Sequence, residues 1–169
     1  MLGKDYEGQD CALARALEVV GERWTLLIVR DALYGVRRFN DFQAHLDIPK
    51  AILSDRLNGL VDDGVLERLP DPDHRGRHLY QLTQAGKDLW PVVHALVVWG
   101  DRYRQGTCRV FQHADCGTPL DETGACPRCK VSPGPDDILT KPLRQTSRDD
   151  PVARALRRPH RMLDPVPGP

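Results

Sequence analysis

Apolar and polar positions alternate with the period of an α-helix in four successive segments of the first 63 residues. Within each segment, apolar side chains recur three and four residues apart, which gives a helix one face to bury. The pattern predicts helices over 10–20, 24–33, 38–46 and 48–63. Proline at position 49 is compatible with the first turn of the fourth helix, because a backbone N–H there has no helical partner.

The next apolar positions change period. Val65–Leu69 and His78–Leu82 are short strand-like runs, and the segment 70–77 between them is rich in Pro, Asp and Gly. These features predict a β-hairpin. A second helical pattern then runs from Thr83 to about Tyr103. Pro91 lies inside it, so we expect either a kink or a break into two helices.

Four helices, a hairpin and a further helix occur in the order of a winged helix-turn-helix, a mainly α fold with a small β-hairpin wing. In that fold the third and fourth helices form the helix-turn-helix. The recognition helix then spans about 48–63, and the wing spans about 70–77.

Aromatic residues and prolines divide the chain near residue 106. Nine of the ten aromatic residues precede this point and only Phe111 follows it, whereas ten of the fourteen prolines follow it. A segment with few large apolar side chains cannot offset its ordering entropy by burial. We therefore expect a folded domain over 1–106, a small module over 107–130 and a Pro-rich, largely disordered tail over 131–169.

The formal net charge of the chain is zero, with 24 basic and 24 acidic residues. Any attraction to nucleic acid must therefore come from local positive charge. No apolar run approaches the roughly 18 residues of a membrane span. The polar N-terminus, MLGKDYEGQDC, lacks the apolar region of a secretory signal. These features predict a cytoplasmic protein without a membrane partner.

Two ligand pairs with the same spacing lie in the small module. Zinc prefers four thiolate or imidazole ligands in a tetrahedron, and a His-x-x-Cys pair followed by a Cys-x-x-Cys pair supplies them. The predicted ligands of a structural zinc ion in a ribbon-like module are His113, Cys116, Cys126 and Cys129. Cys108 competes with His113 for the fourth position, and the repeated spacing favours His113. The alternative is a degraded ribbon with free thiols.

Several local sequences resemble those of HxlR-type transcriptional regulators. They are Cys11 to Gly35 with its Gly-Glu-Arg-Trp-Thr-Leu-Leu-Ile core, Arg38-Phe-Asn-Asp-Phe, Ile48-Pro-Lys-Ala-Ile-Leu-Ser-Asp-Arg-Leu, Asp63-Gly-Val-Leu, Tyr80-Gln-Leu-Thr-Gln-Ala-Gly and Trp99-Gly. The resemblance covers roughly residues 11–105. It implies a winged-helix repressor or activator that binds double-stranded DNA as a homodimer, with its first and last helices at the dimer contact.

Two positions depart from the family pattern. Pro49 stands where the family usually has serine, and Ala51 stands where it often has lysine. The helix therefore lacks a serine cap, and one lysine contact to DNA is missing unless Lys50 replaces it. The operator sequence does not follow from the resemblance.

The candidate DNA contacts combine the start of the recognition helix, the basic wing and the residues before the third helix. They are Arg37, Arg38, Lys50, Ser54, Arg56, Arg75 and Arg77. The alternative is that these side chains are only a solvated surface. For Arg56, a further alternative is an ion pair with Asp62 or Asp63.

Cys11 stands at the start of the first helix, where the helix N-terminus lowers the pKa of a thiol. The resemblance implies a possible redox sensor at this position, and the alternative is a small apolar side chain at a dimer contact. Trp24 and Trp99 are expected to pack in the dimer core. The sequence leaves three possibilities for the effector: an oxidant, a small molecule bound between the long helix and the core, or no effector at all.

No local motif of a catalytic site is present, so an enzyme is not expected. The rival to a DNA-binding regulator is a protein–protein adaptor that uses the winged helix and the ribbon as docking surfaces.

Overall fold

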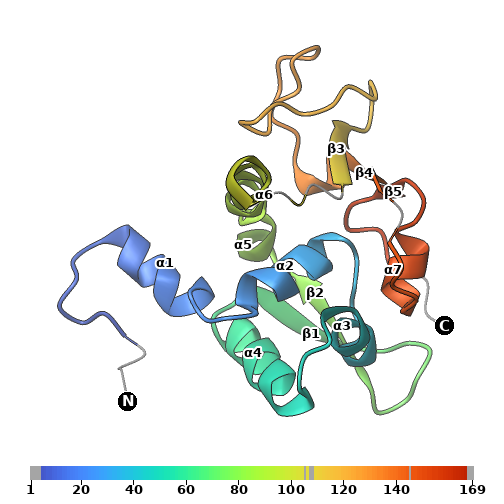
Figure 1. Ribbon diagram of the computed structural model, residues 1–169. Helices are drawn as coiled ribbons and strands as arrows, with labels where there is room; N and C mark the ends of the chain where they lie inside the picture. Colours follow the sequence, from blue (N-terminus) through green and yellow to red (C-terminus); the bar gives the residue numbers. More distant parts are fainter. Residues whose placement is uncertain (1–4, 105, 107–108, 145, 167–169) are drawn as a thin grey trace.

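The structure is a computed structural model that describes residues 5–104, 106, 109–144 and 146–166. The chain opens with α1 (Ala12–Val20), α2 (Thr25–Leu33), α3 (Phe39–Leu46) and α4 (Lys50–Asp62). Each of these helices lies where the apolar periodicity predicts one. α1 projects from the body of the molecule, whereas α2, α3 and α4 pack together (Figure 1).

The predicted hairpin consists of β1 (Leu66–Pro70) and β2 (His78–Leu82). The strands are antiparallel, with Leu66 opposite Leu82. The predicted break of the last helix is also present, since α5 (Gln84–Lys87) ends before α6 (Trp90–Arg104) begins. Pro91 thereby lies in the first turn of α6, where its missing N–H removes no helical hydrogen bond.

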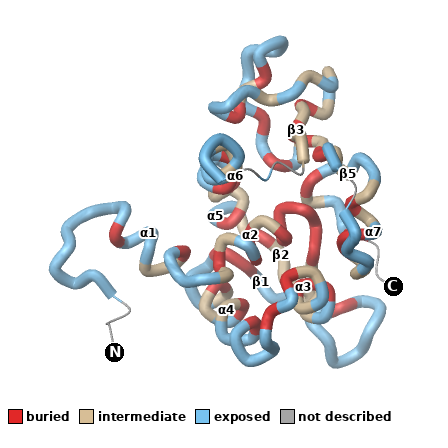
Figure 2. Tube along the Cα trace, in the orientation of Figure 1, coloured by how far each residue is buried: buried red, intermediate tan, exposed pale blue. Residues whose placement is uncertain are grey.

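One core joins the helices, the hairpin and the C-terminal part of the chain. Many of its most deeply buried side chains come from α2, α3, α4 and β1, and Figure 2 shows buried trace where these elements meet. They include Ile28, Leu33, Phe42, Leu53, Leu57, Leu60 and Leu66. The buried positions on α3 and α4 fix the helix-turn-helix geometry.

Beyond α6 the chain forms a second, antiparallel sheet. Its strands are β3 (Arg109–His113), β4 (Ile138–Pro142) and β5 (His160–Arg161), in the order β3-β4-β5, and η1 (Pro135–Asp137) and α7 (Pro151–Ala155) complete the segment. The Asp150 side chain caps α7 by accepting a hydrogen bond from the backbone N–H of Ala153 at 2.9 Å.

The segment after 131 differs from the expected disordered tail, because its described residues form β4, α7 and β5. The side chains of Ile138, Val152 and Met162 are almost fully buried. The prediction of disorder from composition was wrong, because the segment has no aromatic residues of its own but packs its aliphatic side chains on a core that the first domain supplies. The expected boundary at 130 also divides one sheet, since β4 pairs with β3 along its whole length.

The end of the described chain lies against the loop that follows α2. The backbone N–H groups of Leu163 and Val166 donate to the carbonyls of Leu33 and Gly35, at 2.9 and 3.0 Å. Gly35 has a φ of +86°, and a Cβ at this position would collide with the carbonyl of Asp164. Glycine therefore lets the C-terminal segment approach the first domain closely.

Within the described ranges, no helix combines the length and the apolar character that crossing a membrane requires.

Candidate nucleic-acid interface and metal centre

The helix-turn-helix is formed by α3, a turn at 47–49 and α4. Asp47 adopts a left-handed φ of 53° at the end of α3, and Ile48 is buried in the core below the turn. Pro49 occupies the cap position of α4, and no side chain caps this helix. Lys50 and Ser54 are exposed on its first turn and a half, which is the part of a recognition helix that reaches base edges.

Arg56 lies in α4 but is engaged inside the chain. Its Nη2 lies 2.9 Å from Glu22 Oε2, and its Nη1 lies 3.3 Å from Asp55 Oδ2. These are the ion pairs of Arg56 among the described residues, so the alternative of an ion pair is realised with Glu22 and Asp55 and not with Asp62 or Asp63. The pair with Glu22 connects α4 to the segment that precedes α2.

Arg37 and Arg38 connect the start of α3 to other elements. Arg37 Nη2 donates to the carbonyl of Leu163 at 3.2 Å. Arg38 Nε donates to Asp71 Oδ2 at 3.2 Å, and its Nη2 donates to Asp73 Oδ2 at 2.8 Å. Arg38 thus fixes the base of the wing loop to the helix-turn-helix.

Asp71 is the buried partner in this contact, with only 1% of its side chain exposed. The hydrogen bond from Arg38 lowers the pKa of Asp71, as do those from the backbone N–H of Asp73 and from His74. The same pairing raises the pKa of Arg38. Sequence reasoning missed Asp71, and its place in the Pro70-Asp-Pro-Asp loop was the available signal.

We expect Asp71→Asn to lower the melting temperature by a few degrees near pH 6, because the lost charge weakens the attachment of the wing. A carboxyl with a lowered pKa stabilises the folded state above its unfolded pKa of about 3.9, and this stabilisation is lost as the pH falls through the folded value. The difference from the wild type should therefore shrink below about pH 4. Thermal melts between pH 2.5 and 6 measure this.

The matched control is Asp73→Asn, because Asp73 contacts the same arginine but its side chain is 68% exposed. An exposed pair contributes little, so this variant should melt close to the wild type. A pH-independent difference for Asp71→Asn would contradict an electrostatic role.

The tip of the wing carries the exposed Arg75 and Arg77 on either side of Gly76, whose φ is +82°. The turn is closed by a hydrogen bond from the N–H of Arg77 to the carbonyl of His74 at 3.1 Å. The wing loop and the start of α4 lie at the same end of the molecule, remote from the cysteine-rich loops (Figure 1). This end therefore presents Lys50, Arg75 and Arg77 to solvent together.

The four predicted metal ligands converge. The ligand atoms of His113, Cys116, Cys126 and Cys129 all lie within 4.8 Å of one another. Cys116 Sγ is 3.5 Å from His113 Nδ1 and 3.5 Å from Cys126 Sγ. Cys108, the alternative ligand, lies outside the described residues.

The two ligand pairs have the same backbone geometry. The N–H of Gly117 donates to the carbonyl of His113 at 2.8 Å, and the N–H of Lys130 donates to the carbonyl of Cys126 at 2.9 Å. Gly117 and Lys130 both have a positive φ, of 67° and 60°. Each pair thus forms the same tight turn, which directs two side chains to one point.

These residues fit a zinc ion. In a tetrahedral site with Zn–S bonds of about 2.3 Å, neighbouring ligand atoms are separated by about 3.5–3.8 Å. Hydrogen bonds from Thr118 lower the pKa of Cys116 to about 6, whereas the hydrogen bond shared with Cys116 raises the pKa of Cys129 to about 11. Hydrogen bonding therefore already favours one thiolate, the form that zinc binds.

Phe111 attaches the cysteine-rich module that contains His113, Cys116, Cys126 and Cys129 to the first domain. Its ring meets Trp90 edge-on at a centroid distance of 4.9 Å and meets His94 at 5.9 Å. Gly124 also lies against His94, whose pKa is lowered by burial. The single aromatic residue beyond 106 thus packs on α6.

Cys11 occupies the cap position of α1 and is exposed. Hydrogen bonds from the backbone N–H groups of Ala14 and Leu13 lower the pKa of its thiol, as expected at a helix N-terminus.

The fold and the two sites define a winged helix-turn-helix protein with an appended cysteine-rich module. The sequence pattern of the HxlR-like helix-turn-helix family matches residues 19–107, which is just over half of the chain. The chain belongs to this family.

Similar proteins agree with this assignment. The uncharacterized HTH-type transcriptional regulator Rv3095 of Mycobacterium tuberculosis strain H37Rv is 43% identical over 131 residues, which cover 76% of this chain and 82% of that protein. The uncharacterized HTH-type transcriptional regulator YvaP of Bacillus subtilis strain 168 is 33% identical over 90 residues, which cover 53% of this chain and 83% of that protein.

Solved structures also match. The crystal structure of PA1607, a candidate transcription factor, is 36% identical with a TM-score of 0.62, and the match covers 69% of this chain and 84% of that one. The redox regulator HypR in its reduced form is 28% identical with a TM-score of 0.51, covering 56% and 94% of the two chains. Together these findings support a DNA-binding transcriptional regulator of the winged-helix type.

Proposed function

We propose that the protein is a homodimeric, sequence-specific DNA-binding transcriptional regulator. α4 enters the major groove with Lys50 and Ser54, and the wing places Arg75 and Arg77 on the phosphate backbone or in the minor groove. The observation that carries the proposal is that the exposed start of α4 and the basic wing tip share one end of the molecule.

Positive charge at one end of the molecule explains how a chain with a net charge of zero can bind DNA. Arg38 and Arg56 are engaged in ion pairs with carboxylates of the same chain, whereas Lys50, Arg75 and Arg77 are exposed. Basic side chains at one end suffice to contact phosphates. A polar recognition face favours DNA over the adaptor alternative, which would require an exposed apolar face.

Fluorescence anisotropy with labelled DNA from the protein's own promoter region tests the proposal. Binding that survives excess unrelated duplex and weakens as salt rises is the expected result. Absence of binding by the dimeric, zinc-loaded protein would refute it and favour the adaptor function.

Unpartnered apolar side chains support the homodimer. Leu13 and Leu17 are exposed on the projecting α1, and Trp99 and Tyr103 are exposed on α6, where the centres of their tilted rings lie 5.5 Å apart. Trp99 is 53% exposed and so is not part of the core of a single chain. A second copy that covers α1 and α6 would bury these residues, as expected from the family resemblance.

We expect Trp99→Asp to convert the dimer to a monomer, because it places a charge in an apolar contact. Light scattering coupled to size exclusion would show half the wild-type mass, and affinity for promoter DNA should fall at least tenfold because two half-sites are no longer bound together. The control is Leu143→Asp, a substitution at an apolar residue that is 55% exposed and belongs to neither α1 nor α6. An unchanged mass for Trp99→Asp would exclude α6 from the contact.

The cluster of His113, Cys116, Cys126 and Cys129 is proposed to hold one structural zinc ion. Its donor set and its convergence within 4.8 Å support this assignment. Such an ion would supply folding energy to the loops around it.

Cys11 is proposed as the redox-responsive residue of this regulator. Its exposure, its lowered pKa and the similarity to the redox regulator HypR support this role.

A further inference from the structure

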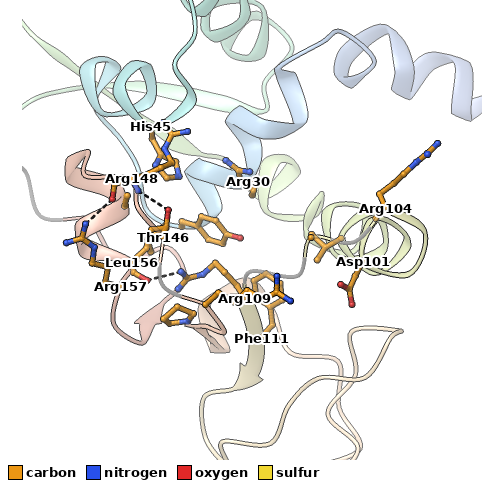
Figure 3. A pocket seen from close by; sticks show the side chains of 17 residues that line it. Arg30, His45, Asp101, Arg104, Arg109, Phe111, Thr146, Arg148, Leu156 and Arg157 are labelled. Carbon is orange, nitrogen blue, oxygen red and sulfur yellow. Dashed lines mark hydrogen bonds between the residues drawn. The ribbon is translucent and has the colours of Figure 1, made fainter.

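A cavity of about 520 Å³ lies where the first domain meets the C-terminal sheet and α7 (Figure 3). This volume is within the range of pockets that hold small organic ligands. Its apolar lining includes Tyr34 from the end of α2, Val97 from α6, Phe111 from β3 and Leu156 after α7. No part of the helix-turn-helix reading face or of the metal cluster contributes to it.

The polar lining is dominated by arginine. The arginines are Arg30, Arg104, Arg109, Arg144, Arg148 and Arg157, and they share the lining with one carboxylate, that of Asp101. Three further carboxylates, which are not part of the lining, pair with arginines of the lining and compensate three of these charges. Asp31 pairs with Arg30 at 2.6 Å, Asp150 with Arg148 at 3.2 Å and Asp149 with Arg157 at 2.9 Å.

Six guanidinium groups against four carboxylates leave a surplus of two positive charges around the cavity. His45 also faces it, but its Nδ1 lies 2.9 Å from Asp150 Oδ1, within the same compensated group. A concave, partly apolar site with surplus positive charge attracts small anions. The lining therefore favours a ligand that combines a negatively charged group with an apolar part.

Arg109 is held in place between the polar and apolar parts of the lining. Its Nε donates to Thr140 Oγ1 at 2.8 Å, and its Nη1 donates to the carbonyl of Leu156 at 2.8 Å (Figure 3). Its guanidinium lies 5.6 Å from the centre of the Tyr34 ring. A fixed, planar guanidinium beside aromatic rings suits a flat ligand that carries a carboxylate.

We propose that this cavity binds a small aromatic carboxylate. The carboxylate would lie among the guanidinium groups, and the ring would pack on Phe111, Leu156 and the Tyr34 ring. Figure 3 shows Arg148 and Arg157 on one side of the cavity, Asp101 and Arg104 on the other, and Arg109 and Phe111 between them.

The proposed dimer contact leaves this cavity open. With 100° per helical residue, Val97, Gly100 and Arg104 lie roughly a third of a turn around α6 from the stripe that contains Trp99 and Tyr103. A second copy on that stripe therefore covers a different face of the helix, and the two faces meet at Arg104, whose guanidinium lies 6.0 Å from the centre of the Trp99 ring.

The cavity also borders the helix-turn-helix. Arg148 donates to the carbonyl of Ala44 in α3 at 3.1 Å, and His45 of the same helix bonds Asp150 at the start of α7. A ligand that reorients Arg148 would change the contacts of α3, the helix that precedes the recognition helix. This step makes the carboxylate an effector and rests on the proposed function.

Isothermal titration of the DNA-free, full-length protein with benzoate and salicylate tests the binding site. Benzamide is the neutral probe of matched shape. We expect both acids to bind with a Kd below about 1 mM and benzamide to bind at least tenfold more weakly, because it lacks the charge that the arginines recognise.

Two variants locate the site. Arg104→Ala/Arg144→Ala removes two exposed charges and should weaken binding at least tenfold. Gly100→Leu introduces a side chain where a Cβ meets nothing within 4 Å, and it should block entry while favouring the helix. Arg158→Ala, which removes an exposed arginine outside the lining, should leave binding unchanged.

The proposal is overturned if neither acid binds up to about 10 mM, if benzamide binds equally well, or if binding survives both variants.

Promoter affinity is then measured with and without saturating salicylate. Ligand binding without a shift in a measurable DNA affinity would confirm the site and refute its effector role, whereas failure to bind DNA at all would count against the proposed function alone.

Discussion

Replacing Cys126 with serine is expected to abolish zinc binding and to unfold the loops between β3 and β4. Cys126 is almost fully buried, and its Sγ lies 3.5 Å from Cys116 Sγ and accepts a hydrogen bond from the backbone N–H of Cys129 at 3.4 Å. Structural zinc supplies about 10–16 kcal/mol to folding in zinc-finger peptides. The loops have few apolar side chains to replace that contribution.

Metal analysis of the purified full-length chain measures the first effect, with one zinc per wild-type chain and none in Cys126→Ser. Amide resonances of 114–131 should collapse to unfolded positions, while those of α2 to α4 should persist, because the core that holds these helices takes none of its buried side chains from 114–131. Cys11→Ser removes a cysteine that is not in the cluster and should retain one zinc. A Cys126→Ser chain that keeps both zinc and folded loops would refute the site.

The metal cluster could be predicted from sequence because its information is local. Two ligands separated by two residues form a tight turn by themselves, and the repeated spacing identified His113 together with the three cysteines. The hairpin and the first four helices are local in the same way, since each is determined by the periodicity of its own side chains.

The C-terminal segment could not be predicted, because its partners lie more than a hundred residues away. Met162 and Val152 are unremarkable aliphatic residues in a proline-rich stretch, and their burial depends on surface that α2 and α3 provide. The cavity could not be predicted from sequence for the same reason. Its arginines are spread from Arg30 to Arg157 and come together only through the tertiary fold.

The candidate DNA contacts divide in a way that sequence could not anticipate. A long side chain such as that of Arg38 or Arg56 can reach a carboxylate on another element. The tertiary fold alone brings Asp71 close to Arg38 and Glu22 close to Arg56. Lys50, Arg75 and Arg77, by contrast, have side chains that remain exposed to solvent in the folded chain.

Arg75→Ala/Arg77→Ala is expected to weaken binding to promoter DNA by about 10- to 100-fold near physiological salt. Each arginine that neutralises a phosphate releases counterions, so removing two such arginines per subunit lowers affinity and also flattens its salt dependence. The slope of log K against log salt should become less steep by about 0.9 for each phosphate that is no longer neutralised. Anisotropy titrations over a range of salt concentrations around the physiological value measure both quantities.

The charge-matched control is Arg128→Ala/Lys130→Asn, which removes two positive charges from the cysteine-rich module at the opposite end of the molecule. Asparagine is chosen at 130 because it tolerates the left-handed φ of 60°. If both double variants weaken binding equally, only the total charge matters and the wing has no special place on the duplex. If the wing variant alone loses affinity with a shallower salt slope, Arg75 and Arg77 contact phosphate, because a residue that merely stabilised the fold would leave the slope of the remaining folded protein unchanged.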